Sequence, residues 1–105
     1  MNVAQMSESQ MQAGIKRMAK QLGYLVYHTM NAIGSDKGYP DLHVVGHGRE
    51  WFLELKGPKP KISDAQIAWI DALVALGRDA RFVHPPDYDG ILQELMDAYS
   101  ADVLR

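Results

Sequence analysis

Cysteine is absent from the 105 residues of the chain. Disulfide bonds and thiolate metal sites are therefore excluded, and the composition agrees with a reducing cytoplasm. Long apolar runs are also missing, since no stretch approaches the roughly 18 apolar residues that cross a bilayer. The opening residues MNVAQMSESQ lack the basic and apolar regions of a secretory signal. We therefore expect a cytoplasmic protein without a membrane segment.

An excess of charge of one sign is missing as well. The chain has 11 lysines and arginines against 13 aspartates and glutamates, for a formal net charge of −2. This balance disfavours a protein that coats nucleic acid, which would carry a broad basic surface. It is compatible with an enzyme whose cations lie beside one acidic site, because bound divalent cations reverse the charge of such a site. The length has room for one hydrophobic core, so we expect a single domain over residues 1–105.

Hydrophobic periodicity, caps and turn residues divide the chain into seven elements. Helices are predicted for residues 7–22, 64–77 and 88–99, and strands for residues 24–30, 41–46, 49–56 and 79–84, with a polar loop over 31–40. Ser7 with Gln10 and Ser63 with Gln66 form capping-box patterns at the starts of the first two helices. The order α-β-β-β-α-β-α predicts an α/β fold in which helices flank a mixed sheet.

Apolar residues within these elements mark the expected core. Those of the second helix are Ile67, Ile70, Leu73 and Val74, and those of the third strand are Trp51, Leu53 and Leu55. Trp69 and the methionines are assigned to the core as well.

The two middle strands meet at His47-Gly48, and a two-residue turn at this place predicts a β-hairpin. In that register Asp41 lies directly opposite Glu54, with both side chains on the same face. Lys56 follows Glu54 by two residues and therefore points to that face as well. Two carboxylates and an ammonium are thus expected to converge at the open end of the hairpin. A three-residue turn would break this register.

Two further polar side chains fall on the apolar stripes of helices. Glu8 precedes Met11 by three residues and shares its stripe, and Gln66 lies on the line that continues to Ile70. A carboxylate on an inward stripe is unusual unless something binds it. Alternatively, Glu8 is a first-turn acid favoured by the helix dipole, and Gln66 is only the capping partner of Ser63.

Three carboxylates, a lysine and an amide form a set that suits phosphate chemistry. Mg²⁺ prefers carboxylate oxygens and completes its shell with water and substrate phosphate. Such an ion orients a water for in-line attack, and a neighbouring lysine stabilises the charge of the transition state. Without the other motifs, Asp41 would be a turn residue after Pro40, and Glu54 with Lys56 would be the polar face of an edge strand.

The motif GYPDL (38–42) followed by ELK (54–56) resembles the PD-(D/E)xK nuclease signature. It is similar in particular to the VRR-NUC branch, in which a helical Glu precedes these motifs and a Gln in the next helix follows them. The residues SE (7–8) and ISDAQ (62–66) match the two outer motifs in order and spacing. The resemblance covers about residues 7–84.

This resemblance implies a restriction-endonuclease-like fold and Mg²⁺- or Mn²⁺-dependent hydrolysis of DNA phosphodiester bonds. The metal ligands that it implies are Glu8, Asp41, Glu54 and the carbonyl of Leu55, and the catalytic residues are Asp41, Glu54, Lys56 and Gln66. Lys37, Lys59 and Lys61 flank the motifs and are candidates for contacts with DNA phosphates. Exposed loop lysines are common, so these three could equally have no such role.

The leading hypothesis is a metal-dependent DNA endonuclease. Standalone members of the family that this chain resembles are structure-selective, so we expect four-way junction or flap DNA as the substrate. We also expect a homodimer, because a two-fold axis would match a symmetric junction. One alternative hypothesis is a non-catalytic nucleic-acid-binding module on the same fold. Another is an enzyme that acts on RNA or on a small phosphoester.

Overall fold

The computed structural model describes residues 2–30 and 33–105. Its elements are η1 (Val3–Gln5), α1 (Glu8–Gln21), β1 (Leu25–His28), β2 (Leu42–Gly46), β3 (Arg49–Leu55), α2 (Asp64–Ala75), β4 (Ala80–Val83), η2 (Pro85–Asp87) and α3 (Tyr88–Val103). They confirm the predicted α-β-β-β-α-β-α order, to which η1 and η2 add two short 3₁₀ helices. Of the expected loop, residues 31 and 32 lie outside the described residues.

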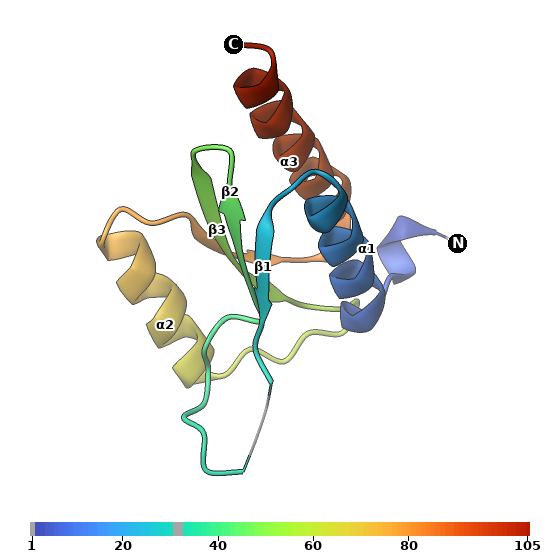
Figure 1. Ribbon diagram of the computed structural model, residues 1–105. Coiled ribbons are helices and arrows are strands. Elements are labelled where there is room, and N and C mark those ends of the chain that lie inside the picture. Colours follow the sequence, from blue (N-terminus) through green and yellow to red (C-terminus); the bar gives the residue numbers. More distant parts are fainter. Residues whose placement is uncertain (1, 31–32) are drawn as a thin grey trace.

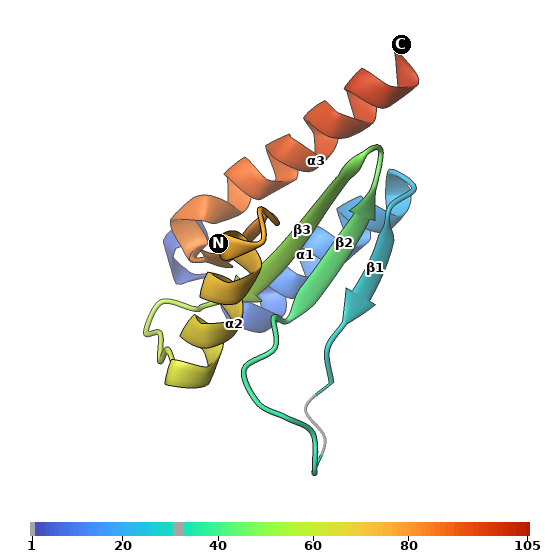
Figure 2. The same ribbon diagram turned by 90° about the vertical axis from the view of Figure 1, so that its left-hand side faces the viewer.

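The four strands form one mixed sheet in the order β1-β2-β3-β4. β1 and β3 run antiparallel to β2, whereas β4 runs parallel to β3. Figure 1 shows the sheet between two helical layers, with α1 and α3 on one side and α2 on the other. The α2 layer packs over β3 and β4 and leaves β1 and β2 uncovered on its side of the sheet (Figure 2). No helix in the described ranges is long and apolar enough to cross a bilayer.

The main core lies between the sheet and the layer formed by α1 and α3. The fully buried side chains of this core include Met11, Ile15, Leu42, Val44, Trp51, Leu53, Leu55, Val83, Ile91 and Leu95. A smaller core under α2 consists of Phe52, Ile70, Leu73 and Ala80. Burial of Trp51, Leu53 and Leu55 confirms the prediction that this face of β3 is apolar. The opposite face of β3, with Phe52 and Glu54, therefore lies on the α2 side.

The helix starts are as the sequence predicts. Ser7 Oγ accepts a hydrogen bond from the Gln10 amide at 3.1 Å, and Gln10 Oε1 accepts one from the Ser7 amide at 2.9 Å. Ser63 and Gln66 repeat this exchange at the start of α2, at 3.2 and 3.0 Å. Each box satisfies two backbone donors that have no partner within the helix. α3 continues four residues past the predicted end at residue 99.

The β2–β3 hairpin has the predicted register. Gly46 pairs with Arg49, and the pairing continues to Leu42 opposite Leu53. The two turn residues, His47 and Gly48, have φ values of 50° and 75°. Positive φ at both positions is typical of the tight turns whose twist matches that of a hairpin.

The interior face of α2 is narrower than predicted. Ile70 and Leu73 are buried, but Ile67 and Val74 are exposed, so their predicted inward positions are wrong. Trp69 is 39% exposed, so its assignment to the core is wrong as well. The physical reason is that α2 rests on one edge of the sheet, and within residues 2–30 and 33–105 no second helix covers its flanks on that side.

His47 joins the hairpin turn to two helices. Its Nδ1 lies 2.8 Å from Asp102 Oδ2 in α3, and its Nε2 lies 2.6 Å from the carbonyl oxygen of Leu22, the residue after α1. Both partners are acceptors, so both ring nitrogens carry a proton when both bonds are made. The hydrogen bonds to Asp102 and then to Leu22 accordingly raise the pKa of His47 above its ordinary value.

A raised pKa means that His47 stabilises the fold most when it is charged. The contribution is complete below its ordinary pKa and is lost as the pH rises through the raised value. We therefore expect His47→Asn to lower the free energy of unfolding more at pH 5.5 than at pH 8.5, as measured by urea denaturation. Asn tolerates the positive φ of this turn. It also removes the ring contacts of His47 with Tyr24 and Tyr99, but this loss does not depend on pH, so the difference between the two pH values reports the charged hydrogen bonds. An equal loss at both pH values would contradict this role.

Candidate active site

Glu54 and Lys56 are the two buried charged residues among those that the structure describes. Glu54 is 4% exposed and Lys56 is 3% exposed, and both belong to the α2 side of the C-terminal end of β3. The Lys56 ammonium lies 3.5 Å from Glu54 Oε2. Burial of a charge is costly unless it is paired and hydrogen-bonded, so this pair requires further partners.

Lys56 finds its partners in the loop and helix that follow it. Its Nζ donates to the carbonyl oxygen of Lys61 at 2.7 Å and to Gln66 Oε1 at 2.8 Å. The ammonium thus has two hydrogen-bond acceptors, in addition to its ion pair with Glu54. The amine is therefore fixed in position at the end of the sheet.

Gln66 connects the start of α2 to this buried pair. Its Oε1 accepts hydrogen bonds from the Ser63 amide and from Lys56 Nζ, and its Nε2 donates to Glu54 Oε2 at 3.0 Å. The sequence leaves two alternatives open for Gln66, a capping partner or a member of the site. The structure shows that one side chain makes both sets of contacts.

Asp41 lies one residue before β2, next in register to the Leu42–Leu53 pair and thus beside Glu54. Its Oδ2 accepts a hydrogen bond of 2.8 Å from the Leu55 amide. Because the N–H and C=O of a strand residue point to the same edge, the Leu55 carbonyl is also directed to the Asp41 side. Thr29 in turn donates to the Asp41 carbonyl oxygen at 2.9 Å and fixes the backbone at this point.

The carboxylates of Asp41 and Glu54 repel each other, and a bound cation would reduce this repulsion. Burial, and then the charge of Asp41, raise the pKa of Glu54 well above its ordinary value, while Lys56 opposes the shift. The two carboxylates are thus close enough to repel each other in a desolvated place. Each is held through one oxygen, Oδ2 of Asp41 and Oε2 of Glu54, so each has a second oxygen for another ligand.

Glu8 is not part of this hydrogen-bonded group. It is exposed, so its predicted inward position is wrong: as the first residue of α1 it precedes the buried stripe that starts at Met11. It does lie beside the site, because a Cβ on Gly57 would be 3.8 Å from Glu8 Cγ. Within residues 2–30 and 33–105, no three His, Cys, Asp or Glu side chains gather as a metal-binding cluster.

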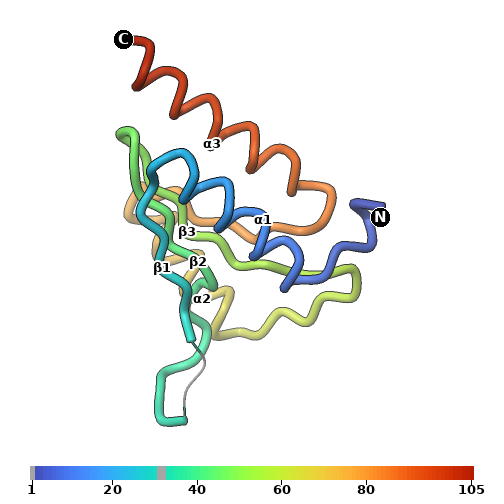
Figure 3. Tube along the Cα trace, turned by 45° about the vertical axis from the view of Figure 1, so that its right-hand side comes forward, coloured from blue at the N-terminus to red at the C-terminus, as the bar shows by residue number. Residues whose placement is uncertain are grey.

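The candidate DNA-binding lysines, Lys37, Lys59 and Lys61, are exposed. Lys59 and Lys61 belong to the loop after β3, which passes beside the start of α1 in Figure 3. Lys61 contributes its main-chain oxygen to the site, a contact that no residue-type pattern in the sequence could reveal. The side chains of the three lysines are exposed to solvent and therefore accessible to a DNA phosphate.

Gly38 allows the loop before Asp41 to pack closely against α2. Its φ is 93°, and a Cβ at this position would lie 2.5 Å from the carbonyl carbon of Ala65. The loop backbone therefore packs directly on the first turn of α2, with no room for a side chain. This contact places the segment that ends in Asp41 next to the helix that carries Gln66.

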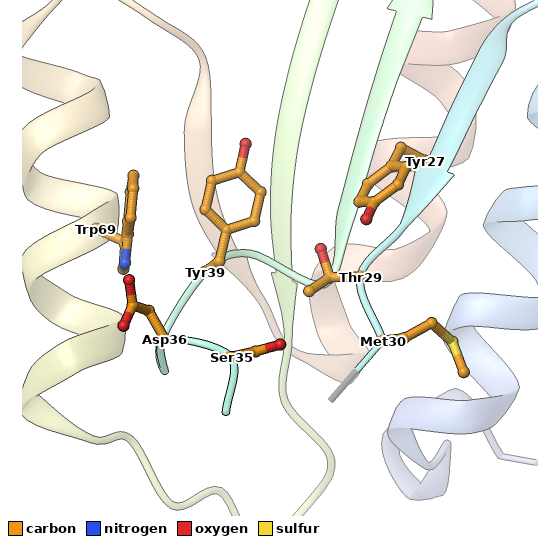
Figure 4. A pocket seen from close by; sticks show the side chains of 8 residues that line it. Tyr27, Thr29, Met30, Ser35, Asp36, Tyr39 and Trp69 are labelled. Carbon is orange, nitrogen blue, oxygen red and sulfur yellow. The ribbon is translucent and has the colours of Figure 1, made fainter. Parts of the chain in front are cut away.

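An aromatic cavity lies beside the site and could not be predicted from the sequence. Tyr27, Tyr39 and Trp69 line a volume of about 430 Å³ on the α2 side of the sheet (Figure 4). The sequence assigns Trp69 to the core, and Tyr39 is a variable position within the GYPDL motif. A cluster of aromatic residues from a strand, a loop and a helix is visible only once the chain is folded.

Comparison with known proteins matches most of the chain to one domain family. The family described as "VRR-NUC domain" matches residues 1–84, which include everything from η1 to the end of β4. A solved structure described as a VRR_NUC domain is similar with a TM-score of 0.66 and 25% sequence identity. The similarity covers 84% of this chain and 97% of that chain. A comparison with curated proteins gives no match.

Gly38→Ala should destabilise the protein for two reasons, the positive φ and the overlap with Ala65. Gly34→Ala is the matched control, because Gly34 has a φ of 90° and a Cβ added there would have nothing within 4 Å. We expect the control to cost at most about 1–2 kcal/mol and Gly38→Ala to cost more, as measured by chemical denaturation. Equal effects would show that the close approach to α2 does not matter.

Proposed function

The chain belongs to the VRR-NUC domain family, whose domains are of the nuclease type, and from this premise we propose a Mg²⁺- or Mn²⁺-dependent DNA endonuclease. The observation that carries the proposal is the buried group at the end of β3, where Asp41, Glu54, Lys56 and Gln66 meet. In this proposal residues 1–105 act as one nuclease domain. We also propose the cytoplasmic location that the sequence leads us to expect.

The donor set fits a divalent cation with oxygen ligands. Mg²⁺ is commonly held by one or two carboxylates and keeps several waters. Asp41, Glu54 and the Leu55 carbonyl would hold it, and the exposed Glu8 would complete the acidic set. When bound, the ion would lower the pKa of a water and neutralise charge on the phosphate. The mutual repulsion of Asp41 and Glu54 supports this assignment, since a cation would offset it.

The residues of the chain would supply position and charge. Lys56 is held by Lys61 and Gln66, so its ammonium loses little freedom when a phosphate approaches. A fixed cation next to the phosphate stabilises the negative charge that grows in the transition state. Gln66 would act as a positioning residue, because it contacts both Glu54 and Lys56. Lys37, Lys59 and Lys61 would contact phosphates at the periphery and set the register of the DNA.

The proposed substrate is four-way junction or flap DNA. A domain of 105 residues has little surface to read base sequence in a groove, so shape is the more accessible feature. We include a homodimer in the proposal, since two copies would place two cuts on a symmetric junction. Leu25 and Val45 on the uncovered half of the sheet, and Leu104 after α3, are exposed apolar side chains that a second copy would cover. Light scattering that gives a monomer mass at working concentration would contradict the dimer.

A non-catalytic nucleic-acid-binding module is the second candidate. Against it stands the acidic pair, because carboxylates that face a phosphate weaken binding unless a cation lies between them. An enzyme for RNA or a small phosphoester uses the same chemistry and would be distinguished by its substrate.

The direct test is cleavage of labelled duplex, flap, four-way-junction and single-stranded DNA and of RNA, with Mg²⁺, with Mn²⁺ and with EDTA. We expect metal-dependent cleavage, and a loss of at least about a hundredfold in Lys56→Ala, because one charged group at the reacting phosphate is removed. Lys20→Ala, at the exposed end of α1, is the matched control and should cleave normally. Circular dichroism checks that both variants are folded.

Full activity of Lys56→Ala would overturn the assignment of the site. Equal DNA binding with Mg²⁺ and with EDTA, without cleavage in either, would favour the binding module. Cleavage of RNA alone would change the substrate class but would keep the site.

A further inference from the structure

The aromatic cavity on the α2 side has no part in the chemistry described above. Its volume is about 430 Å³, within the range of small-ligand pockets. Among the described residues, those of its lining that matter here are Tyr27, Thr29, Ser35, Asp36, Tyr39 and Trp69. It lies between Trp69 of α2 and Tyr27 of β1 (Figure 4). The cavity therefore opens on the same side of the sheet as Glu54 and Lys56.

Three aromatic rings from three elements surround the cavity in Figure 4. Tyr39 is anchored, with its ring centroid 4.9 Å from that of Trp69 and 6.4 Å from that of Phe52. Tyr27 and Trp69 retain open surface, being 61% and 39% exposed. Exposed rings that line a hollow offer flat apolar surface to a ligand with a π-face, and a nucleic-acid base is such a ligand.

The charge of the cavity lining favours the base of a nucleotide over its phosphate. Among the lining residues that the structure describes, Asp36 is an acid and none is a lysine or arginine. A carboxylate repels a phosphate, so the sugar-phosphate backbone is disfavoured here. The polar edge of a base, with its amino and imino donors, can instead approach Asp36 and Ser35 while its face contacts the rings. Phosphates are better placed at Lys56 and the peripheral lysines.

The cavity is close to the proposed point of cleavage. Tyr39 precedes Asp41 by two residues, so their Cα atoms are at most about 7.6 Å apart. Thr29 connects the two places, because it lines the cavity and its hydroxyl donates to the Pro40 carbonyl oxygen at 2.7 Å. At about 3.4 Å or more per nucleotide along a strand, a base in the cavity would lie about one to three nucleotides from the scissile phosphate.

We propose that this cavity receives an unpaired base of the DNA strand that is cleaved. A base within a duplex is stacked on its neighbours and cannot enter a hollow of this kind. The cavity would thus select strands with unpaired nucleotides beside the cut, as in a flap or at the branch of an open junction. This inference rests on the proposed function, since the ligand is part of the substrate of the same site.

Binding without cleavage tests the proposal separately from the nuclease activity. Fluorescence anisotropy in EDTA compares two labelled DNAs: a duplex with a short single-stranded extension, and the same DNA with abasic sites throughout the extension. We expect about tenfold tighter binding of the DNA that carries bases, the effect of one stacked base. Rising salt should weaken both affinities and leave their ratio unchanged, because no lysine or arginine stands among the described lining residues.

Variants of the exposed rings make the test specific. Trp69→Ala and Tyr27→Ala should remove the preference and bind both DNAs as the wild type binds the abasic one. Trp69→Phe keeps an aromatic face and should retain it. Val74→Ala, at an exposed apolar position of the same helix, is the matched control and should behave as wild type.

Equal wild-type affinities for the two DNAs, or an undiminished preference in both alanine variants, would overturn the proposal. Cleavage together with equal affinities would refute the base cavity and leave the nuclease function standing. A base-dependent preference without cleavage under any condition would support the cavity and refute the nuclease.

Discussion

The site depends on the side chain of Gln66. This amide closes the capping box of α2 through the Ser63 amide, and it also joins Lys56 to Glu54 at the end of β3. The interaction that starts the helix is therefore the one that satisfies a buried ion pair. Because Glu54 and Lys56 are almost fully removed from water, they depend on such partners. The position of α2 on the sheet and the geometry of the charged group are consequently fixed together.

Much of this arrangement follows from local rules that the sequence displays. A two-residue turn at His47-Gly48 determines every pair of the hairpin, so the convergence of Asp41 and Glu54 could be predicted from turn length alone. The capping boxes and the glycine of the GYPDL motif are equally local. Gly38 permits a backbone contact with Ala65, and without that contact the loop could not reach α2.

Burial that depends on packing between elements far apart in the sequence could not be predicted. Ile67 and Val74 have helical spacing for a core. They remain exposed because α2 is the one helix on its side of the sheet in the part of the chain that the structure describes. Glu8 shares its stripe with Met11, yet it lies at the very start of α1, where the stripe reaches solvent. The aromatic cavity arises because the same lack of coverage leaves Trp69 at its rim.

In the proposed nuclease, a bound divalent cation offsets the repulsion between Asp41 and Glu54. Thermal unfolding of wild type and Asp41→Asn, each in EDTA and in Mg²⁺, tests it directly. Asn keeps an acceptor for the Leu55 amide and removes the charge, so we expect a higher Tm than that of wild type in EDTA. We also expect Mg²⁺ to raise the Tm of wild type and to leave that of Asp41→Asn unchanged. A Tm that falls in Asp41→Asn, or the same response to Mg²⁺ in both proteins, would show that Asp41 does not bind a metal ion.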